Sequence, residues 1–231
     1  MAIPAFLAMT AAEIRGSFPL PPKIGWMACH FSPYSVGLSN LPRSLPPGAL
    51  LILNDITPIH GHDPEVVAEQ LQDCLVAFDS AGVLLDFQRE DNEETANLAA
   101  HLVQALPCPI AVSASYAGPL NCPVFLPPLP HHVPLADWIS PWTGREVWLE
   151  IALDGEEILL CESGATICPL LHPSSEEGFA EAALHCHYRI ETLEEAVRFT
   201  LWRTREDIHT LLEEAETLGI RHAVGLYQEF P

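Results

Sequence analysis

The stretch Phe78–Gln88, FDSAGVLLDFQ, decides the fold assignment. Its apolar part, Gly82–Phe87, is a continuous run rather than an alternating one, which is typical of a strand buried on both faces of a parallel sheet. Asp86 and Gln88 stand at its end, where parallel β/α barrels place their functional side chains. The stretch therefore predicts a buried strand that carries polar groups at its carboxyl end.

Helix signals lie on both sides of this strand. Three side chains suited to capping precede apolar residues at helical spacing, and these predicted N-caps are Asp63, Asn92 and Thr204. Thr192 and Glu195 have the spacing of a capping box, which predicts a further helix at Ala196–Leu201.

Seven further apolar runs read as strands: Ile24–His30, Ala49–Asn54, Ile110–Ser115, Val124–Leu126, Val147–Leu153, Ala183–Tyr188 and Ala223–Tyr227. Strands that alternate with helices indicate parallel β/α units. Asp154-Gly155 is a hairpin signal inside this alternation, so we expect an antiparallel hairpin insertion near residues 146–160.

The length of 231 residues suits one domain, residues 1–231, with a large core. An eight-stranded β/α barrel typically needs about 250 residues. The 22 prolines cluster in segments that we expect to be loops or strand edges, because Pro interrupts helices and central ladders. The predicted fold is therefore α/β, a single (β/α)8-type barrel that is trimmed or distorted.

Family 18 glycoside hydrolases carry a similar pattern on their fourth barrel strand, roughly DGxDxDxE. The chain resembles it at Gly82 and Asp86, whereas Ala81, Leu84 and Gln88 replace its other acidic positions. The C-terminal segment, a predicted helix followed by a strand ending at Tyr227, resembles the family's last β/α unit. That strand usually ends in a Trp beneath the sugar.

The resemblance implies a carbohydrate site that includes Asp86, Gln88, Tyr227 and Glu229. In the family a Glu protonates the glycosidic oxygen and the substrate's acetamido group attacks the anomeric carbon. A Gln amide has no proton that it can give as a general acid. Gln88 then binds a sugar oxygen without performing the acid step, which makes the protein a catalytically impaired relative, a pseudoenzyme. Asp86 is equally well read as a paired carboxylate inside the barrel.

Other side chains are candidates for a site at the carboxyl ends of the strands, and each also has a structural interpretation. As catalytic carboxylates we consider Glu90 and Glu229 beside Asp86, although Glu90 also suits a helix start. Asn54 and Asp55 follow an apolar run and are either ligand-binding or turn residues. Tyr116 and Trp142 either stack on sugar rings or anchor irregular loops.

A metal site is a further alternative. His185 and His187 have HxH spacing in an apparent strand, which would direct both imidazoles to one face. The third and fourth ligands are not evident, so we expect no metal. No Gly-rich phosphate loop occurs, and no cofactor is expected.

Charge and cysteine usage limit the partners and the compartment. Asp and Glu number 31 against 10 Lys and Arg, a formal net charge of −21, which disfavours nucleic acid and anionic membranes. A neutral small-molecule or carbohydrate ligand is compatible with it. The seven scattered cysteines are typical of reduced thiols in a cytoplasm, and the N-terminal segment lacks the features of a signal peptide.

Three functional hypotheses follow. The first is an impaired glycosidase-superfamily barrel that binds a carbohydrate or other small neutral ligand at the carboxyl ends of its strands. The second is a hydrolase, if active a glycoside hydrolase, with a rebuilt catalytic set of Asp86, Glu90 and Glu229, or with a metal on His185 and His187. The third is a structural or partner-binding barrel without a working pocket.

Overall fold

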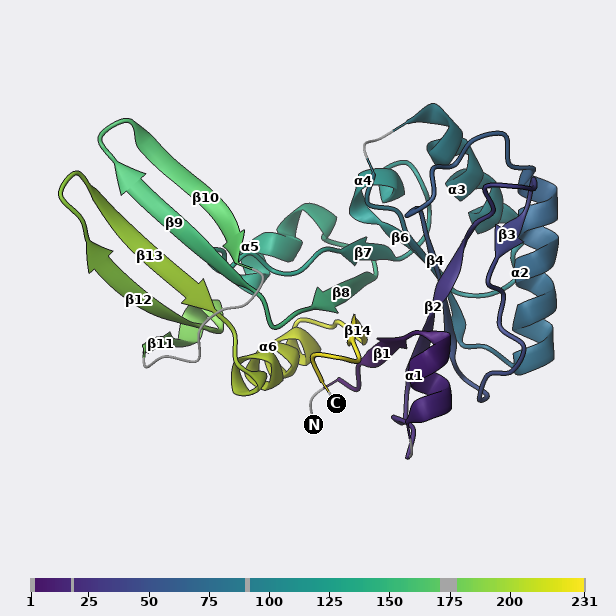
Figure 1. Ribbon diagram of the computed structural model, residues 1–231, viewed down its shortest axis with the longest axis horizontal. Helices are drawn as coiled ribbons and strands as arrows, with labels where there is room; N and C mark the ends of the chain where they lie inside the picture. The colour runs from purple at the N-terminus through teal and green to yellow at the C-terminus, as the bar shows by residue number, and fades with distance from the viewer. Residues whose placement is uncertain (1–2, 18, 90–91, 171–177, 231) are drawn as a thin grey trace.

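A computed structural model describes residues 3–17, 19–89, 92–170 and 178–230 and shows a closed parallel barrel (Figure 1). The barrel strands, in chain order, are β1 (Phe6–Met9), β2 (Ile24–Phe31), β4 (Leu50–Asn54), β5 (Gly82–Asp86), β6 (Ile110–Ser113), β7 (Val124–Leu126), β8 (Val147–Ile151) and β14 (His222–Leu226). Each pairs in parallel with its neighbours, and the β1–β2 pairing closes the ring. The short strand β3 (Leu38–Ser39) adds antiparallel to β2. The predicted barrel is confirmed, although its first strand was not expected.

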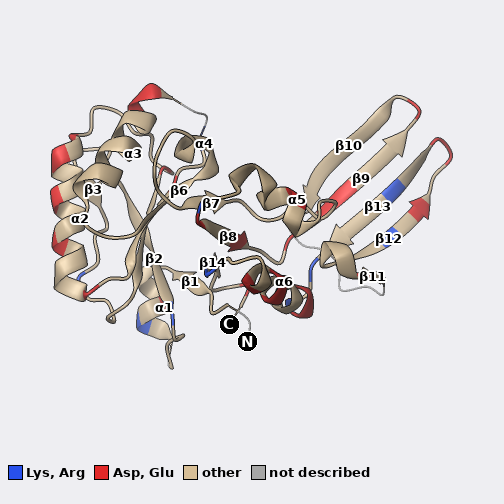
Figure 2. Ribbon diagram, turned by 180° about the vertical axis from the view of Figure 1, so that it is seen from behind, with Lys and Arg blue, Asp and Glu red and all other residues tan. Residues whose placement is uncertain are grey.

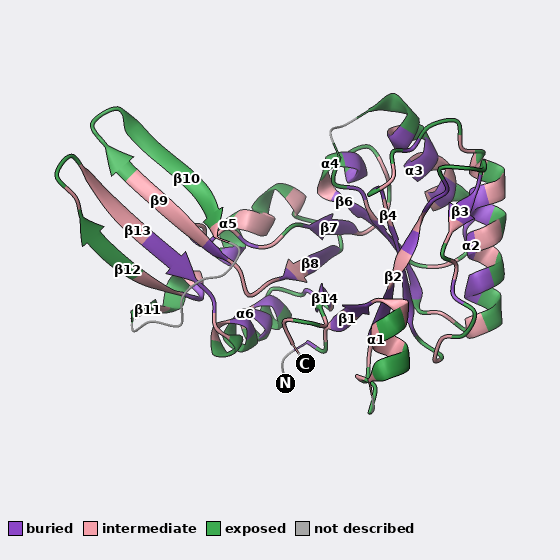
Figure 3. Ribbon diagram, in the orientation of Figure 1, coloured by how far each residue is buried: buried purple, intermediate pink, exposed green. Residues whose placement is uncertain are grey.

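The inside of the barrel is a separate apolar layer. Its buried members alternate with residues that face the helices, and they are Phe6, Ala8, Leu50, Ile52, Leu84, Ala111, Phe125, Trp148 and Val224. Because side chains alternate along a strand, the next inward positions beyond Leu84 and Trp148 are Asp86 and Glu150. Both carboxyl groups therefore point toward the mouth at the strands' carboxyl ends. Figure 3 shows the buried residues concentrated on these barrel strands.

Long helices cover only part of the barrel. They are α2 (Pro64–Phe78), α3 (Glu93–Ala105) and α6 (Arg205–Thr217), and the predicted caps Asp63, Asn92 and Thr204 each accept a hydrogen bond from the first turn. The other helices are short: α1 (Ala11–Gly16), α4 (Ala114–Ala117), α5 (Leu135–Ile139) and the 3₁₀ turn η1 (Ser140–Trp142). The expectation of a trimmed barrel is confirmed.

A five-stranded antiparallel sheet interrupts the barrel between β8 and α6. Its strands are β9 (Gly155–Cys161), β10 (Gly164–Leu170), β11 (Phe179–Glu181), β12 (Cys186–Thr192) and β13 (Ala196–Trp202), with the 3₁₀ turn η2 (Ala182–Leu184) before β12. The late antiparallel insertion is confirmed, but its placement at 146–160 was wrong. β8 pairs in parallel with β7 and β14, whereas β9 pairs with β10 and β13.

The helix expected at Ala196–Leu201 is also wrong, because these residues form β13. β13 pairs antiparallel with β9 on one side and with β12 on the other. The capping-box spacing of Thr192 and Glu195 instead falls on the turn between β12 and β13, where Leu193 N–H donates to the Ala196 carbonyl. Pairing on both edges outweighs a local helix signal.

Acidic residues are spread over the outer helices α2 and α6 and the insertion sheet (Figure 2). Within the described part of the chain, no helix has the length and apolar character needed to cross a bilayer. The first and last barrel strands, β1 and β14, lie side by side, and Tyr227 N–H after β14 donates to the Ala8 carbonyl on β1.

Candidate functional site

A cavity of about 370 Å³ opens at the carboxyl ends of β5, β6, β7 and β8. Its described lining residues are Asp86, Phe87, Gln88, Ser113, Ala114, Ser115, Phe125, Pro127, Pro128 and Glu150. The position matches the face where β/α barrels place their active sites. Two carboxyl groups, one amide and two hydroxyl groups give this largely apolar hollow its hydrogen-bonding capacity.

Asp86 and Gln88 contact each other at this mouth. Gln88 Nε2 donates to Asp86 Oδ1 at 3.1 Å, and the Gln88 side chain is exposed. Burial raises the pKa of Asp86, the hydrogen bond from Gln88 lowers it, and the charge of Asp55 raises it. The structure thus brings together two of the residues predicted to lie at the site, Asp86 and Gln88.

Asp55 holds the loop that carries Gln88. Its carboxylate is 5% exposed and accepts from the backbone N–H groups of Gln88 and Arg89 at 3.0 and 2.9 Å. Asn54 donates to the Met27 carbonyl at 3.0 Å and accepts from the Ile56 N–H. Both residues lie outside the described lining of the cavity, so these contacts describe positioning roles, and ligand binding by either stays a prediction.

The predicted aromatic contacts are not gathered at the cavity. Tyr116 is 3% exposed, packs edge-on against Phe87 and donates to the Arg89 carbonyl at 3.3 Å. Trp142 ends η1, lies outside the described lining of the cavity and has the Arg145 guanidinium over its ring. Sugar stacking by these two side chains stays a prediction without support from their placement.

Tyr227 follows β14 and turns away from the barrel interior. Its hydroxyl accepts a hydrogen bond from Ser17 Oγ at 3.0 Å. Because Val224 faces inward, alternation places Leu226 at the inward position of the mouth. Leu226 is 38% exposed, and ligand binding by Tyr227 stays a prediction.

The two other predicted catalytic carboxylates have different outcomes. Glu229 Oε2 accepts from the Leu153 N–H at 2.7 Å, so it fixes the chain between β8 and β9. Its charge still contributes to raising the pKa of Glu150. Glu90 lies outside the described residues.

Glu150 is the cavity residue that sequence reasoning missed. It stands on β8 and lines the cavity together with Asp86. Burial, followed by the charges of Asp86, Asp154 and Glu229, raises its pKa to about 8. One signal was present in the sequence, because Glu150 is the only charged residue in the apolar run Val147–Leu153.

His185 and His187 do not form a joint site. His185 lies before β12 with its Nε2 2.6 Å from Glu214, whereas His187 Nδ1 is 2.8 Å from Asp207. The described residues contain no group of three or more His, Cys, Asp or Glu side chains arranged to hold a metal ion. The metal alternative gains no support from these contacts.

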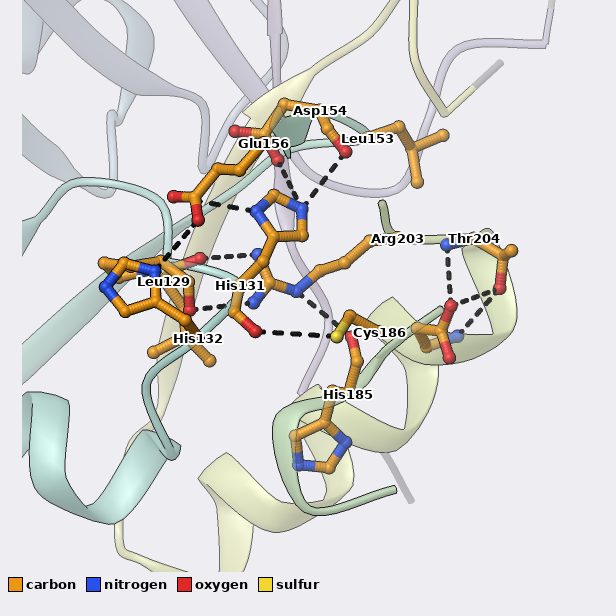
Figure 4. Close-up of polar contacts among 12 residues, drawn as sticks. Leu129, His131, His132, Leu153, Asp154, Glu156, His185, Cys186, Arg203 and Thr204 are labelled. Atoms are coloured by element: carbon orange, nitrogen blue, oxygen red, sulfur yellow. Dashed lines mark hydrogen bonds and ion pairs between the residues drawn. The ribbon is translucent and has the colours of Figure 1, made fainter. Parts of the chain in front are cut away.

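A second polar cluster joins the barrel to the insertion (Figure 4). The imidazole of His131 lies between Asp154 and Glu156, with Nε2 3.2 Å from the Asp154 carbonyl oxygen. The buried Arg203 donates to the carbonyls of Leu129, Pro130 and His185. These contacts tie the β7–α5 loop to both ends of the insertion, and they lie apart from the described cavity lining.

Comparison with known proteins rests on structure, because no family model and no curated protein matches the sequence. A class V chitinase variant from Nicotiana tobaccum, in which a Glu is replaced by Gln, in complex with NAG4, has a TM-score of 0.62 at 9% identity over 97% of this chain and 93% of its own. The fold is that of the family 18 glycoside hydrolases.

Two further structures agree. A Cycas revoluta family 18 chitinase that carries a Glu-to-Gln substitution, in complex with (GlcNAc)4, has a TM-score of 0.61 at 9% identity, over 97% of this chain and 94% of its own. The spore cortex-lytic enzyme SleL of Bacillus cereus has a TM-score of 0.57 at 9% identity, over 96% and 70%. The barrel fold that the resemblance implied is thereby confirmed, and β5 is the fourth barrel strand in chain order.

Proposed function

We propose that this family 18-like barrel binds a carbohydrate, an oligomer of N-acetylglucosamine type, at the cavity formed by Asp86, Gln88 and Glu150. The observation that carries the proposal is the position of the cavity, at the carboxyl ends of barrel strands in a fold shared with chitinases. The paired Asp86 and Gln88 supply a carboxylate acceptor and an amide that both donates and accepts. Sugar hydroxyl and acetamido groups need such partners.

The residue at position 88 makes the protein impaired in the family's own reaction. The amide of Gln88 does not protonate a glycosidic oxygen, because it lacks an acidic proton. Two of the similar chitinases carry a Glu-to-Gln substitution and are complexed with NAG4 or (GlcNAc)4. Their complexes support the idea that a barrel of this kind holds a sugar chain when a glutamine replaces a glutamate.

Isothermal titration calorimetry with chitotetraose tests the proposal. We expect binding by the unmodified protein and an affinity about 5-fold weaker in Gln88→Ala, since one hydrogen bond contributes about 1 kcal/mol. Gln104→Ala removes the same amide from the exposed face of α3 and is the matched control, with unchanged affinity. Absence of binding across chitooligosaccharides, or an equal loss in both variants, would contradict the proposal.

A further inference from the structure

Two carboxyl groups enter the same cavity from different strands. Asp86 ends β5 and Glu150 stands on β8, with β6 and β7 between these two strands in the ring. Both line the cavity, together with the hydroxyl-bearing Ser113 and Ser115 and the rings of Pro127 and Pro128. Most glycosidases use a pair of carboxyl groups on either side of the scissile bond, and this cavity has two carboxyl groups in its lining.

Glu150 is held in the inward register by the strand beneath it. Trp148, two residues earlier, is 2% exposed in the barrel interior, and its ring packs against His222 at 4.4 Å between centroids. The neighbours Leu149 and Ile151 belong to the outer apolar layer. Because both faces of β8 are occupied, the strand cannot rotate Glu150 away from the cavity without exposing this apolar surface.

The two carboxyl groups have different surroundings. Burial raises the pKa of Asp86 above its usual value, and the hydrogen bond that Asp86 accepts from Gln88 Nε2 opposes this rise. The pKa of Glu150 is raised to about 8 because its carboxyl group is buried and because the negative charges of Asp86, Asp154 and Glu229 disfavour its ionised form. Among the described lining residues none is Lys, Arg or His, so no cation there favours a charged Glu150. Two carboxyl groups whose surroundings separate their pKa values can act as the acid and the base of one reaction.

We propose that Glu150 is the catalytic proton donor of this site and that Asp86 accepts the proton of the attacking water. The proposal rests on carbohydrate binding at the cavity. Glu150 gives its proton to the glycosidic oxygen while the bond from that oxygen to the anomeric carbon breaks, and the departing sugar leaves as an alcohol. Water adds to the anomeric carbon, and Asp86 takes its proton. Exchange with solvent then returns a proton to Glu150 and the charge to Asp86.

Dependence on the leaving group tests the role of Glu150. Chitotetraose needs a protonated leaving oxygen, whereas a 2,4-dinitrophenyl chitobioside does not. We expect the unmodified protein to cleave both, with kcat/KM falling as the pH rises through about 8, where Glu150 loses its proton. In Glu150→Gln we expect a loss of about 100-fold or more on chitotetraose and a far smaller loss on the activated glycoside.

Controls separate this role from others. Asp86→Asn should lose activity on both substrates, because the base is needed for each. Glu69→Gln makes the same change as Glu150→Gln on the exposed face of α2 and should leave both rates unchanged. Tight chitotetraose binding without cleavage by the unmodified protein overturns the role of Glu150 alone, as does an equal loss on both substrates in Glu150→Gln. Absence of binding overturns carbohydrate recognition and this inference together.

Discussion

Replacing His131 by Gln should make the free energy of unfolding less dependent on pH at acidic pH. His131 is 1% exposed, and its Nε2 lies 3.2 Å from the Asp154 carbonyl oxygen, which fits an N–H donor on that nitrogen. Its Nδ1 is 3.8 Å from Glu156 Oε1 and makes no hydrogen bond among the described residues. A Gln amide supplies a neutral donor near the place of Nε2 and does not titrate.

The magnitude follows from the pKa of His131. Burial, then the charge of Arg203, lowers that pKa from 6.5 to about 4, and Glu156 opposes the shift only in part. Below pH 6.5 the unfolded chain therefore binds a proton that the folded protein does not. The contribution of His131 to the free energy of unfolding is fully present above pH 6.5. It decreases as the pH falls toward 4, by about 2.5 kcal/mol between pH 7 and pH 4.5.

Urea unfolding at pH 7 and at pH 4.5 measures this contribution. The wild-type protein and His131→Gln share their other titrating groups, so the difference between their two pH dependences isolates His131. We expect the variant to lose about 2.5 kcal/mol less than the wild type. His209→Gln, on the exposed surface of α6, is the matched control and should retain the wild-type slope. An identical slope in His131→Gln would refute the reasoning.

Two further changes probe the structure around β5. Gly82→Ala should lower the free energy of unfolding by about 1–3 kcal/mol, because a Cβ there would lie 2.5 Å from the Pro109 carbonyl oxygen; Gly16→Ala, with open space at its Cβ, is the control in the same urea experiment. Asp55→Ala should lower the free energy of unfolding by about 3 kcal/mol and speed amide hydrogen exchange after β5, because it leaves two backbone N–H groups without their acceptor. Asp73→Ala, at an exposed position, is the control and should change neither quantity. Unchanged exchange in Asp55→Ala would contradict its positioning role.

Periodicity predicted the barrel well because its strands are buried on both faces. Gly82–Phe87 and Val124–Leu126 are continuous apolar runs, and the structure makes strands of almost the same extent. β1 went unrecognised because its four residues, Phe6–Met9, follow a mildly apolar segment without a clear boundary. In the insertion, residues on strands such as β10 are exposed, so burial leaves little pattern to read.

The site was harder to predict because its members come from different strands. Asp86 and Gln88 were found through local spacing on one strand, and they do meet in the structure. Asp55 was found for its position after β4, yet its carboxylate binds backbone rather than lining the cavity. To predict Glu150 one must know which alternate residues of β8 face the barrel interior. The position of Trp148 inside the closed barrel shows this, and the sequence alone does not.

The carboxyl groups at the cavity influence one another's ionisation. Relative to the family pattern, β5 has an apolar Leu84, and the neutral Gln88 follows two residues after its end. Asp86 is therefore the single acidic side chain among these three positions. β8 contributes Glu150 to the same cavity. With no described basic side chain in the lining, an additional carboxylate at position 88 would raise the cost of ionising Asp86 and Glu150 further. The neutral amide of Gln88 instead opposes the rise that burial causes in the pKa of Asp86, whereas burial and the neighbouring carboxylates raise the pKa of Glu150 to about 8.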